Sequence, residues 1–81
     1  MFKARTADGR NNISGTRVKE LRKALQISQR ELSDRLQVVG LDIDKNAVQR
    51  IESGERFVTD IEIIALSKCF NVTVNNLLGI K

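Results

Sequence analysis

The sequence contains no histidine, tryptophan or tyrosine, and its single cysteine is Cys69. Without histidine, the chain has neither a histidine general base nor a histidine metal ligand. One cysteine cannot form a disulfide framework or a cysteine-rich zinc site, and it fits a reducing cytoplasm. We therefore expect no metal and no other cofactor. Catalytic residues are not expected either, because the hydroxyls and carboxylates are scattered among helix caps and form no general-base constellation.

Long hydrophobic runs are also missing. No apolar run exceeds five residues, whereas a spanning helix needs roughly 20, and the N-terminus lacks the apolar core of about 7 to 15 residues found in signal peptides. Three phenylalanines are the only aromatic residues, too few for a platform that stacks single-stranded bases. A soluble, cytoplasmic protein without a membrane partner is expected.

The length and the charge limit the remaining possibilities. A chain of 81 residues that is 41% hydrophobic can build one compact core but not two. Lysine and arginine exceed aspartate and glutamate by 14 to 10, which leaves a net charge of +4 and favours an anionic partner. Residues 1–30 carry eight basic and two acidic side chains, and residues 31–81 carry six basic and eight acidic ones. The excess positive charge therefore lies near the N-terminus.

Two regions differ in pattern. Residues 1–13 have no helical apolar period and are rich in Arg, Asn and Gly, which predicts a basic arm that is mobile or only loosely docked. Residues 14–81 are predicted to form a folded domain. Five helices with short connections are expected in it, at about residues 15–25, 28–38, 44–53, 59–70 and 73–78. Such a pattern predicts an all-α bundle.

Polar residues mark the expected helix ends. Ser28, Asp44, Thr59 and Thr73 stand at N-cap positions, Ser28 and Thr59 with a glutamate three residues later, and Gly54 is the expected left-handed stop of the third helix. Apolar residues at helical spacing are expected to face the core. These residues are Val18, Leu21 and Leu25 in the first helix, Leu32 and Leu36 in the second, Val48 and Ile51 in the third, and Ile61, Ile64, Ala65 and Cys69 in the fourth.

The second and third expected helices form a helix-turn-helix unit. In such a unit the second helix enters the major groove of DNA. The third expected helix is polar for its length, since Lys45, Asn46, Gln49 and Arg50 fall outside its apolar stripe. Lysine and arginine can donate to guanine O6 and N7, and asparagine or glutamine can pair with adenine. The pattern is typical of DNA recognition, although a solvated helix face would have the same composition.

The stretches TRVKELRKALQISQRELSDRL, AVQRIESGER and IEIIALSKCFNVTVNNLLG occur in this order. Together they resemble the Cro and phage-repressor type of helix-turn-helix domain, often called the XRE family. The resemblance covers about residues 14–79 and is carried by ELR, SQREL and RIESGER. It implies a λ-repressor-like bundle whose recognition helix, at about residues 44–53, binds in the major groove.

The resemblance also implies roles for individual residues. Gln29 matches a position that contacts a phosphate and braces the recognition helix, and Arg22 with Glu52 matches a salt bridge between the first and third helices. Ser53 and Arg56 match phosphate contacts beyond the recognition helix. The expected DNA-binding residues are Gln29, Arg30, Lys45, Asn46, Gln49, Arg50, Ser53 and Arg56.

One segment departs from the family pattern. Between Leu36 and Ile51 the family usually has about five fewer residues, so QVVGLDI lengthens the turn between the second and third helices. Its apolar residues are expected to pack as a plug between helices and so to hold the recognition helix. These residues are Val38, Val39, Leu41 and Ile43.

The sequence thus predicts a sequence-specific regulator of transcription, a repressor, that binds double-stranded DNA at a palindromic operator. One recognition helix reads only a few base pairs, so a homodimer is expected. Leu77, Leu78 and Ile80 are the expected dimer contact. The alternative is a protein-interaction or antitoxin-type module that keeps this scaffold without reading DNA. The acidic balance of residues 31–81 favours that alternative.

Overall fold

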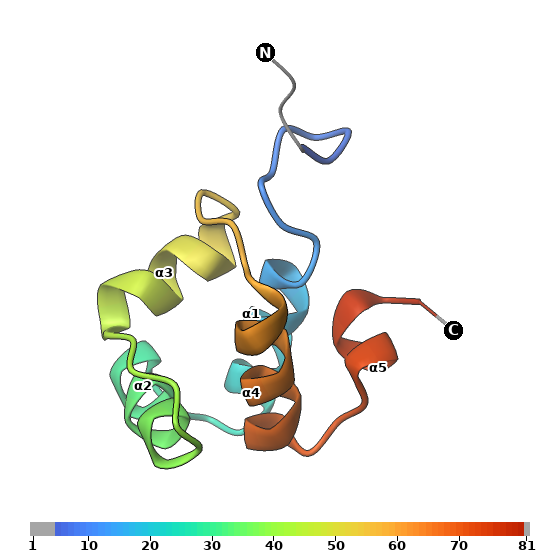
Figure 1. The fold of residues 1–81 in the computed structure, drawn as a ribbon. Coiled ribbons are helices and arrows are strands. Elements are labelled where there is room, and N and C mark those ends of the chain that lie inside the picture. The colour runs from blue at the N-terminus through green and yellow to red at the C-terminus, as the bar shows by residue number, and fades with distance from the viewer. Residues whose placement is uncertain (1–4, 81) are drawn as a thin grey trace.

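A computed structural model describes residues 5–80, which fold into five helices joined by short connections (Figure 1). The helices are α1 (Gly15–Ala24), α2 (Gln29–Val38), α3 (Lys45–Ser53), α4 (Asp60–Phe70) and α5 (Val74–Leu78). Within residues 5–80 there is no strand, and no helix there is long and apolar enough to cross a membrane. The predicted all-α fold class is confirmed.

The helix ends lie where the polar caps predict them. The side chains of Ser28, Asp44, Thr59 and Thr73 each accept a hydrogen bond from a backbone N–H of the helix that follows. Gly54 ends α3 with a φ of +87°, a conformation that a residue with a side chain rarely adopts. The predicted caps and the predicted glycine stop are therefore confirmed.

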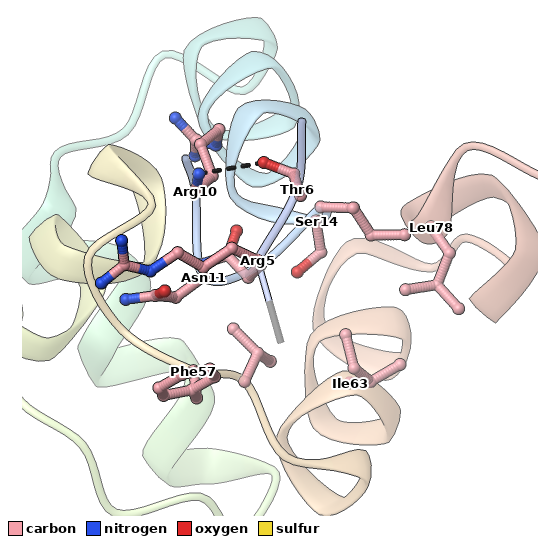
Figure 2. Close-up of a pocket in the computed structure, with 11 residues that line it drawn as sticks. Arg5, Thr6, Arg10, Asn11, Ser14, Phe57, Ile63 and Leu78 are labelled. Atoms are coloured by element: carbon pink, nitrogen blue, oxygen red, sulfur yellow. Dashed lines mark hydrogen bonds between the residues drawn. The ribbon is translucent and has the colours of Figure 1, made fainter. Parts of the chain in front are cut away.

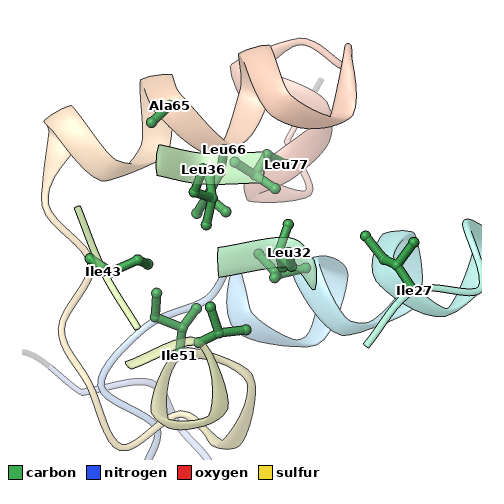
Figure 3. Close-up of a cluster of buried hydrophobic side chains, with 10 residues drawn as sticks. Ile27, Leu32, Leu36, Ile43, Ile51, Ala65, Leu66 and Leu77 are labelled. Atoms are coloured by element: carbon green, nitrogen blue, oxygen red, sulfur yellow. The ribbon is translucent and has the colours of Figure 1, made fainter. Parts of the chain in front are cut away.

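The core forms around the apolar stripe of α2. Leu32 and Leu36 are fully buried between α3 on one side and α4 with α5 on the other (Figure 3). The buried apolar residues are Val18, Ile27, Leu32, Leu36, Ile43, Val48, Ile51, Ala65, Leu66 and Leu77. In the view of Figure 1, α3 and α5 lie on opposite sides of α1 and α4.

The first helix ends differently from the prediction. Leu25 was expected in the core but is 48% exposed, and Ile27 is buried in its place. The reason is the C-terminal turn of α1, in which Gln26 adopts a left-handed φ of +59°. The Ile27 N–H then donates to the Arg22 carbonyl, as in a Schellman motif, and this turn directs Ile27 inward.

Of the four apolar residues predicted to form a plug between α2 and α3, only two pack inward. Gly40 is left-handed, and the N–H groups of Gly40 and Leu41 donate to the carbonyls of Gln37 and Leu36, which completes a Schellman motif. Ile43 enters the core and Leu41 packs against it. The prediction was wrong for Val38 and Val39, which are 87% and 39% exposed. Val38 still belongs to α2, where the helical period turns it away from the buried Leu36, and Val39 is the cap that follows.

The inward face of α4 also differs from the prediction. Ile61 and Ile64 are 70% and 49% exposed, whereas Leu66 is fully buried. The capping box explains the difference, because the Glu62 carboxylate accepts a hydrogen bond from the Thr59 N–H and is buried there. With position 62 facing inward, the 3.6-residue period places Ala65 and Leu66 in the core and turns Ile61 and Ile64 outward.

These two faces of α4 predict unequal costs of truncation. Leu66→Ala should lower the free energy of unfolding by about 2–5 kcal/mol, because it leaves a cavity in the core. Ile61→Ala should change it by less than about 0.5 kcal/mol, because Ile61 is mostly exposed. Urea unfolding of both variants at neutral pH measures the difference. Equal losses would show that both residues are buried.

Candidate nucleic-acid interface

The exposed face of α3 carries the polar residues that the sequence singles out. Lys45, Asn46, Gln49 and Arg50 are all exposed, while Val48 on the opposite face is 1% exposed. Among the ion pairs within residues 5–80, none involves Lys45 or Arg50. The face therefore presents two cations and two amides whose hydrogen-bonding groups point away from the core.

The N-terminus of α2 lies next to this face. Arg30 is exposed and lines a shallow groove between α2 and α3 together with Lys45 and Asp44. Gln29 is partly buried, and its Nε2 donates to Glu52 Oε1 at 3.1 Å. The structure thus brings Arg30 and Lys45 together, and it gives Gln29 the bracing contact to α3 that the resemblance implies.

The Glu52 carboxylate ties three helices together. Arg22 of α1 donates to it twice, from Nε at 2.6 Å and from Nη2 at 3.1 Å. Arg22 Nη1 also donates to the Ile27 carbonyl at 2.9 Å. The hydrogen bonds to Glu52 raise the pKa of Arg22 above its ordinary value, despite the opposing effect of burial. The predicted salt bridge between the first and third helices is therefore present, and it is buried, with Glu52 only 6% exposed.

A segment outside the helices caps the C-terminus of α3. Arg10 donates to the Glu52 carbonyl at 2.9 Å and to the Ser53 carbonyl at 3.2 Å. Asn12 donates to the Ile51 carbonyl at 3.1 Å, and the Asn11 N–H donates to the Gly54 carbonyl at 2.8 Å. The last carbonyls of a helix have no partner within the helix. Here residues 10–12 supply that partner.

These contacts correct the prediction of a mobile or loosely docked arm. Asn12 is 8% exposed, and residues 6–10 close into a turn through hydrogen bonds between Thr6 and Arg10 (Figure 2). Residues 1–4 of the predicted arm lie outside the described residues. Sequence reasoning missed this cap because polar side chains that bind distant backbone carbonyls leave no periodic signal.

The close approach of α1 to α3 depends on Gly15. Its N–H donates to Asn12 Oδ1 at 2.8 Å. A Cβ atom at this position would lie 1.9 Å from the Ile51 carbonyl oxygen, closer than any side chain can approach. The start of α1 therefore packs directly on the end of α3, with Asn12 bonded to both.

The last two predicted site residues are Ser53, the final residue of α3, and Arg56 in the turn that follows. Ser53 is exposed, and its hydroxyl donates to the Arg50 carbonyl at 3.1 Å. The Arg56 guanidinium pairs with the buried Glu62 carboxylate of the capping box. Arg56 is therefore held as a link between this turn and α4, a role that the sequence did not suggest.

A hollow of about 530 Å³ lies between the N-terminal segment, the turn after α3, and α5 (Figure 2). Phe57, Ile63 and Leu78 line its apolar walls. Phe57 and Ile80 are more than half exposed. The predicted dimer contact requires a correction here, because Leu77 is fully buried in the core and is not available to a partner.

The free cysteine of the described residues, Cys69, is partly buried on α4. Burial raises the pKa of the Cys69 thiol, which disfavours the reactive thiolate. Within residues 5–80, no group of three or more Cys, Asp and Glu side chains is placed to hold a metal ion.

Comparisons with known proteins find one family model and two solved structures that are similar to this chain. The family model HTH_3, described as helix-turn-helix, matches residues 18–77. A crystal structure of the P22 c2 repressor protein in complex with synthetic operator 9T is 25% identical, with a TM-score of 0.69, and the match covers 83% of this chain and 94% of that one. The restriction-modification controller protein C.AhdI from Aeromonas hydrophila is 28% identical, with a TM-score of 0.68, over 79% of this chain and 86% of that one. No curated protein matches the sequence.

The buried position of Glu52 predicts a large cost when its charge is removed. Glu52→Gln should lower the free energy of unfolding by about 3–5 kcal/mol, because Arg22 would remain buried without a counter-charge. Glu31→Gln is the matched control, since Glu31 pairs with Arg35 at 3.7 Å on the surface and such pairs contribute about 0–1 kcal/mol. Urea unfolding at pH 7 compares the two. A loss for Glu52→Gln as small as that of the control would contradict the buried-network account.

Proposed function

The chain belongs to the XRE-type helix-turn-helix family, and from this membership we infer that it is a DNA-binding regulator of transcription. We propose further that it is a repressor that recognises a specific sequence in double-stranded DNA. In this proposal α3 lies in the major groove and the N-terminus of α2 faces the adjacent phosphates. The P22 c2 repressor, whose structure contains a synthetic operator, has a similar fold.

The observation that carries the proposal is the outer face of α3. It exposes two cations that form no ion pair within residues 5–80 and two amides, while its inner side is fixed by the core and by Glu52. A solvated surface helix needs no such anchoring, whereas base readout needs donors and acceptors held in a fixed geometry. The combination of a polar outer face with a buried ionic anchor therefore favours recognition.

Separate groups of residues account for affinity and for choice of sequence. Lys45 and Arg50 are proposed to donate to guanine O6 and N7, and Asn46 and Gln49 to pair with adenine. The residues proposed to contact the phosphate backbone are Gln29, Arg30 and Ser53. Contacts to phosphates position a protein on DNA and account for most of its salt-dependent affinity, and base contacts specify the sequence.

Arg56 has a different role in this proposal from the one implied by the family resemblance. Its guanidinium is paired with Glu62, so a phosphate would compete with a buried carboxylate for it. We therefore assign Arg56 to holding the turn between α3 and α4. Ser53 stays in the group of phosphate contacts because it is exposed at the end of α3.

We also propose that the protein binds a palindromic site as a homodimer. One recognition helix spans only a few base pairs, and two copies would place their α3 helices about 34 Å apart, one turn of DNA. The proposed contact consists of Leu78, Ile80 and the neighbouring Phe57, in place of the buried Leu77. Phe57 and Leu78 both line the hollow near α5. Phe57 is 57% exposed, and Ile80, which follows α5, is 54% exposed.

A second candidate is a protein-interaction module on the same scaffold. Its support is the apolar surface formed by Val39, Ile61 and Ile64, which line one hollow and are 39%, 70% and 49% exposed. Contiguous apolar surface of this kind often marks a protein contact. A protein that uses this surface alone would bind no duplex in preference to another.

Duplex selection followed by titration in rising salt tests the proposed function. The selected duplex should bind more tightly than a random one, and its affinity should fall steeply as salt rises, because each neutralised phosphate releases counterions. Arg50→Ala should cost about 1–3 kcal/mol on the selected duplex and relax the preference at one base pair.

Arg35→Ala is the matched control for that experiment. Arg35 is an arginine on α2 whose ion pair within residues 5–80 is with Glu31 on the surface, so its loss should leave the sequence preference unchanged. If no duplex is preferred over random DNA, the proposed function is wrong, and the protein-interaction module becomes the favoured candidate. An equal loss on every duplex for Arg50→Ala would show that Arg50 does not read a base.

Charge placed on the proposed dimer face should dissociate the dimer. Ile80→Asp should weaken self-association by at least about tenfold, because a carboxylate would be buried in an apolar contact. Ile61→Asp is the control on the far side of α4 and should have no effect. Sedimentation equilibrium measures the self-association constant of both variants. Dissociation by Ile61→Asp with no effect of Ile80→Asp would place the contact on α4 instead.

A further inference from the structure

The C-terminus of α3 is held by residues that do not belong to the helix-turn-helix unit. Four consecutive carbonyls, from Ile51 to Gly54, each accept a hydrogen bond from residues 10–12. We propose that Arg10 is a positioning residue for DNA recognition, which sets the orientation of α3 without touching DNA. This inference rests on the proposed function, because it concerns how α3 reads a duplex.

The chemistry of the contact suits an arginine. The end of a helix carries a partial negative charge and unpaired carbonyls, so a cation placed there is stabilising. The fork of the guanidinium lets Arg10 bind the carbonyls of Glu52 and Ser53 at the same time. A lysine places its three donors on one nitrogen and lacks the planar fork, whose two terminal nitrogens each bind one carbonyl in Arg10.

The location of the contact connects it to the reading face. Glu52 is held from inside by Arg22 and Gln29, and its carbonyl is held from outside by Arg10. Arg50 lies two residues before Glu52 on the same short helix. Bidentate hydrogen bonds to bases tolerate little displacement, so a shift of the last turn of α3 would disturb base contacts first.

Arg10 itself is poorly placed to bind a phosphate. Both terminal nitrogens already donate to backbone carbonyls, and Nε is buried. The side chain also lies against Gly54, where an added Cβ would come within 2.7 Å of it. These contacts distinguish positioning from direct electrostatic contact, and the two roles have different signatures in salt.

The test compares Arg10→Ala, Arg10→Lys and the control Arg35→Ala on the selected duplex and on random DNA across a salt series. For Arg10→Ala we expect about tenfold weaker binding to the selected duplex, unchanged binding to random DNA and an unchanged salt slope. Arg10→Lys keeps the charge but loses the fork, so it should show the same loss of discrimination to a lesser degree. The control should match the wild type.

Other results would overturn the inference. A salt slope reduced by about one, with weaker binding to every duplex, would show that Arg10 contacts a phosphate. Equal weakening on both duplexes at an unchanged slope would reduce Arg10 to a general stabilising residue. Discrimination equal to that of the wild type would remove any role in recognition.

Hydrogen exchange in the free protein separates failure of this inference from failure of the proposed function. The N–H groups of Gly54 and Arg56 donate to the carbonyls of Ile51 and Arg50, so they report on the last turn of α3. Their exchange should be at least about tenfold faster in Arg10→Ala and unchanged in Arg35→Ala. Unchanged exchange in Arg10→Ala would show that Arg10 does not hold α3, whether or not the protein prefers a duplex. Faster exchange in a protein that prefers no duplex would instead refute the proposed function.

Discussion

The carboxylate of Glu52 is the constraint on which the arrangement of the helices depends. A buried charge without partners lowers the stability of a folded protein by several kcal/mol. In the folded chain this carboxylate therefore needs hydrogen-bond donors around it. Arg22 and Gln29 provide them, one from α1 and one from α2. Because both donors are fixed to their own helices, satisfying one carboxylate sets the relative positions of α1, α2 and α3.

This anchor matters because α3 has little apolar surface of its own. The helix has nine residues, and its fully buried apolar side chains are Val48 and Ile51. A helix of this length is marginal in isolation and owes its stability to its surroundings. The Asp44 cap at one end, the Glu52 network below and residues 10–12 at the other end supply polar contacts where apolar packing is limited. The outer face is thereby left free for the polar residues that the proposed function uses.

Local features of the sequence predicted the helices well. The caps at Ser28, Asp44, Thr59 and Thr73 and the stop at Gly54 depend on neighbouring residues, and all were confirmed. Features that depend on tertiary contacts were harder to predict. The burial of Glu62 rotates α4 and exposes Ile61, and no apolar count reveals that a glutamate faces inward.

In the candidate site, too, some features could be predicted from the sequence, and those that depend on tertiary contacts could not. The exposure of the α3 residues followed from their polar character, and the link from Arg22 to Glu52 followed from the family resemblance. The cap formed by residues 10–12 and the pairing of Arg56 with Glu62 could not be predicted, because each joins residues through contacts with no sequence period.

The most direct test of this account is an amide and side-chain map of the isotope-labelled protein titrated with its selected duplex, measured by nuclear magnetic resonance. The largest shift changes are expected at the N-terminus of α2 and on the outer face of α3, at Lys45, Asn46, Gln49 and Arg50. Largest changes at Val39, Ile61 and Ile64, with α3 unaffected, would contradict DNA recognition by α3.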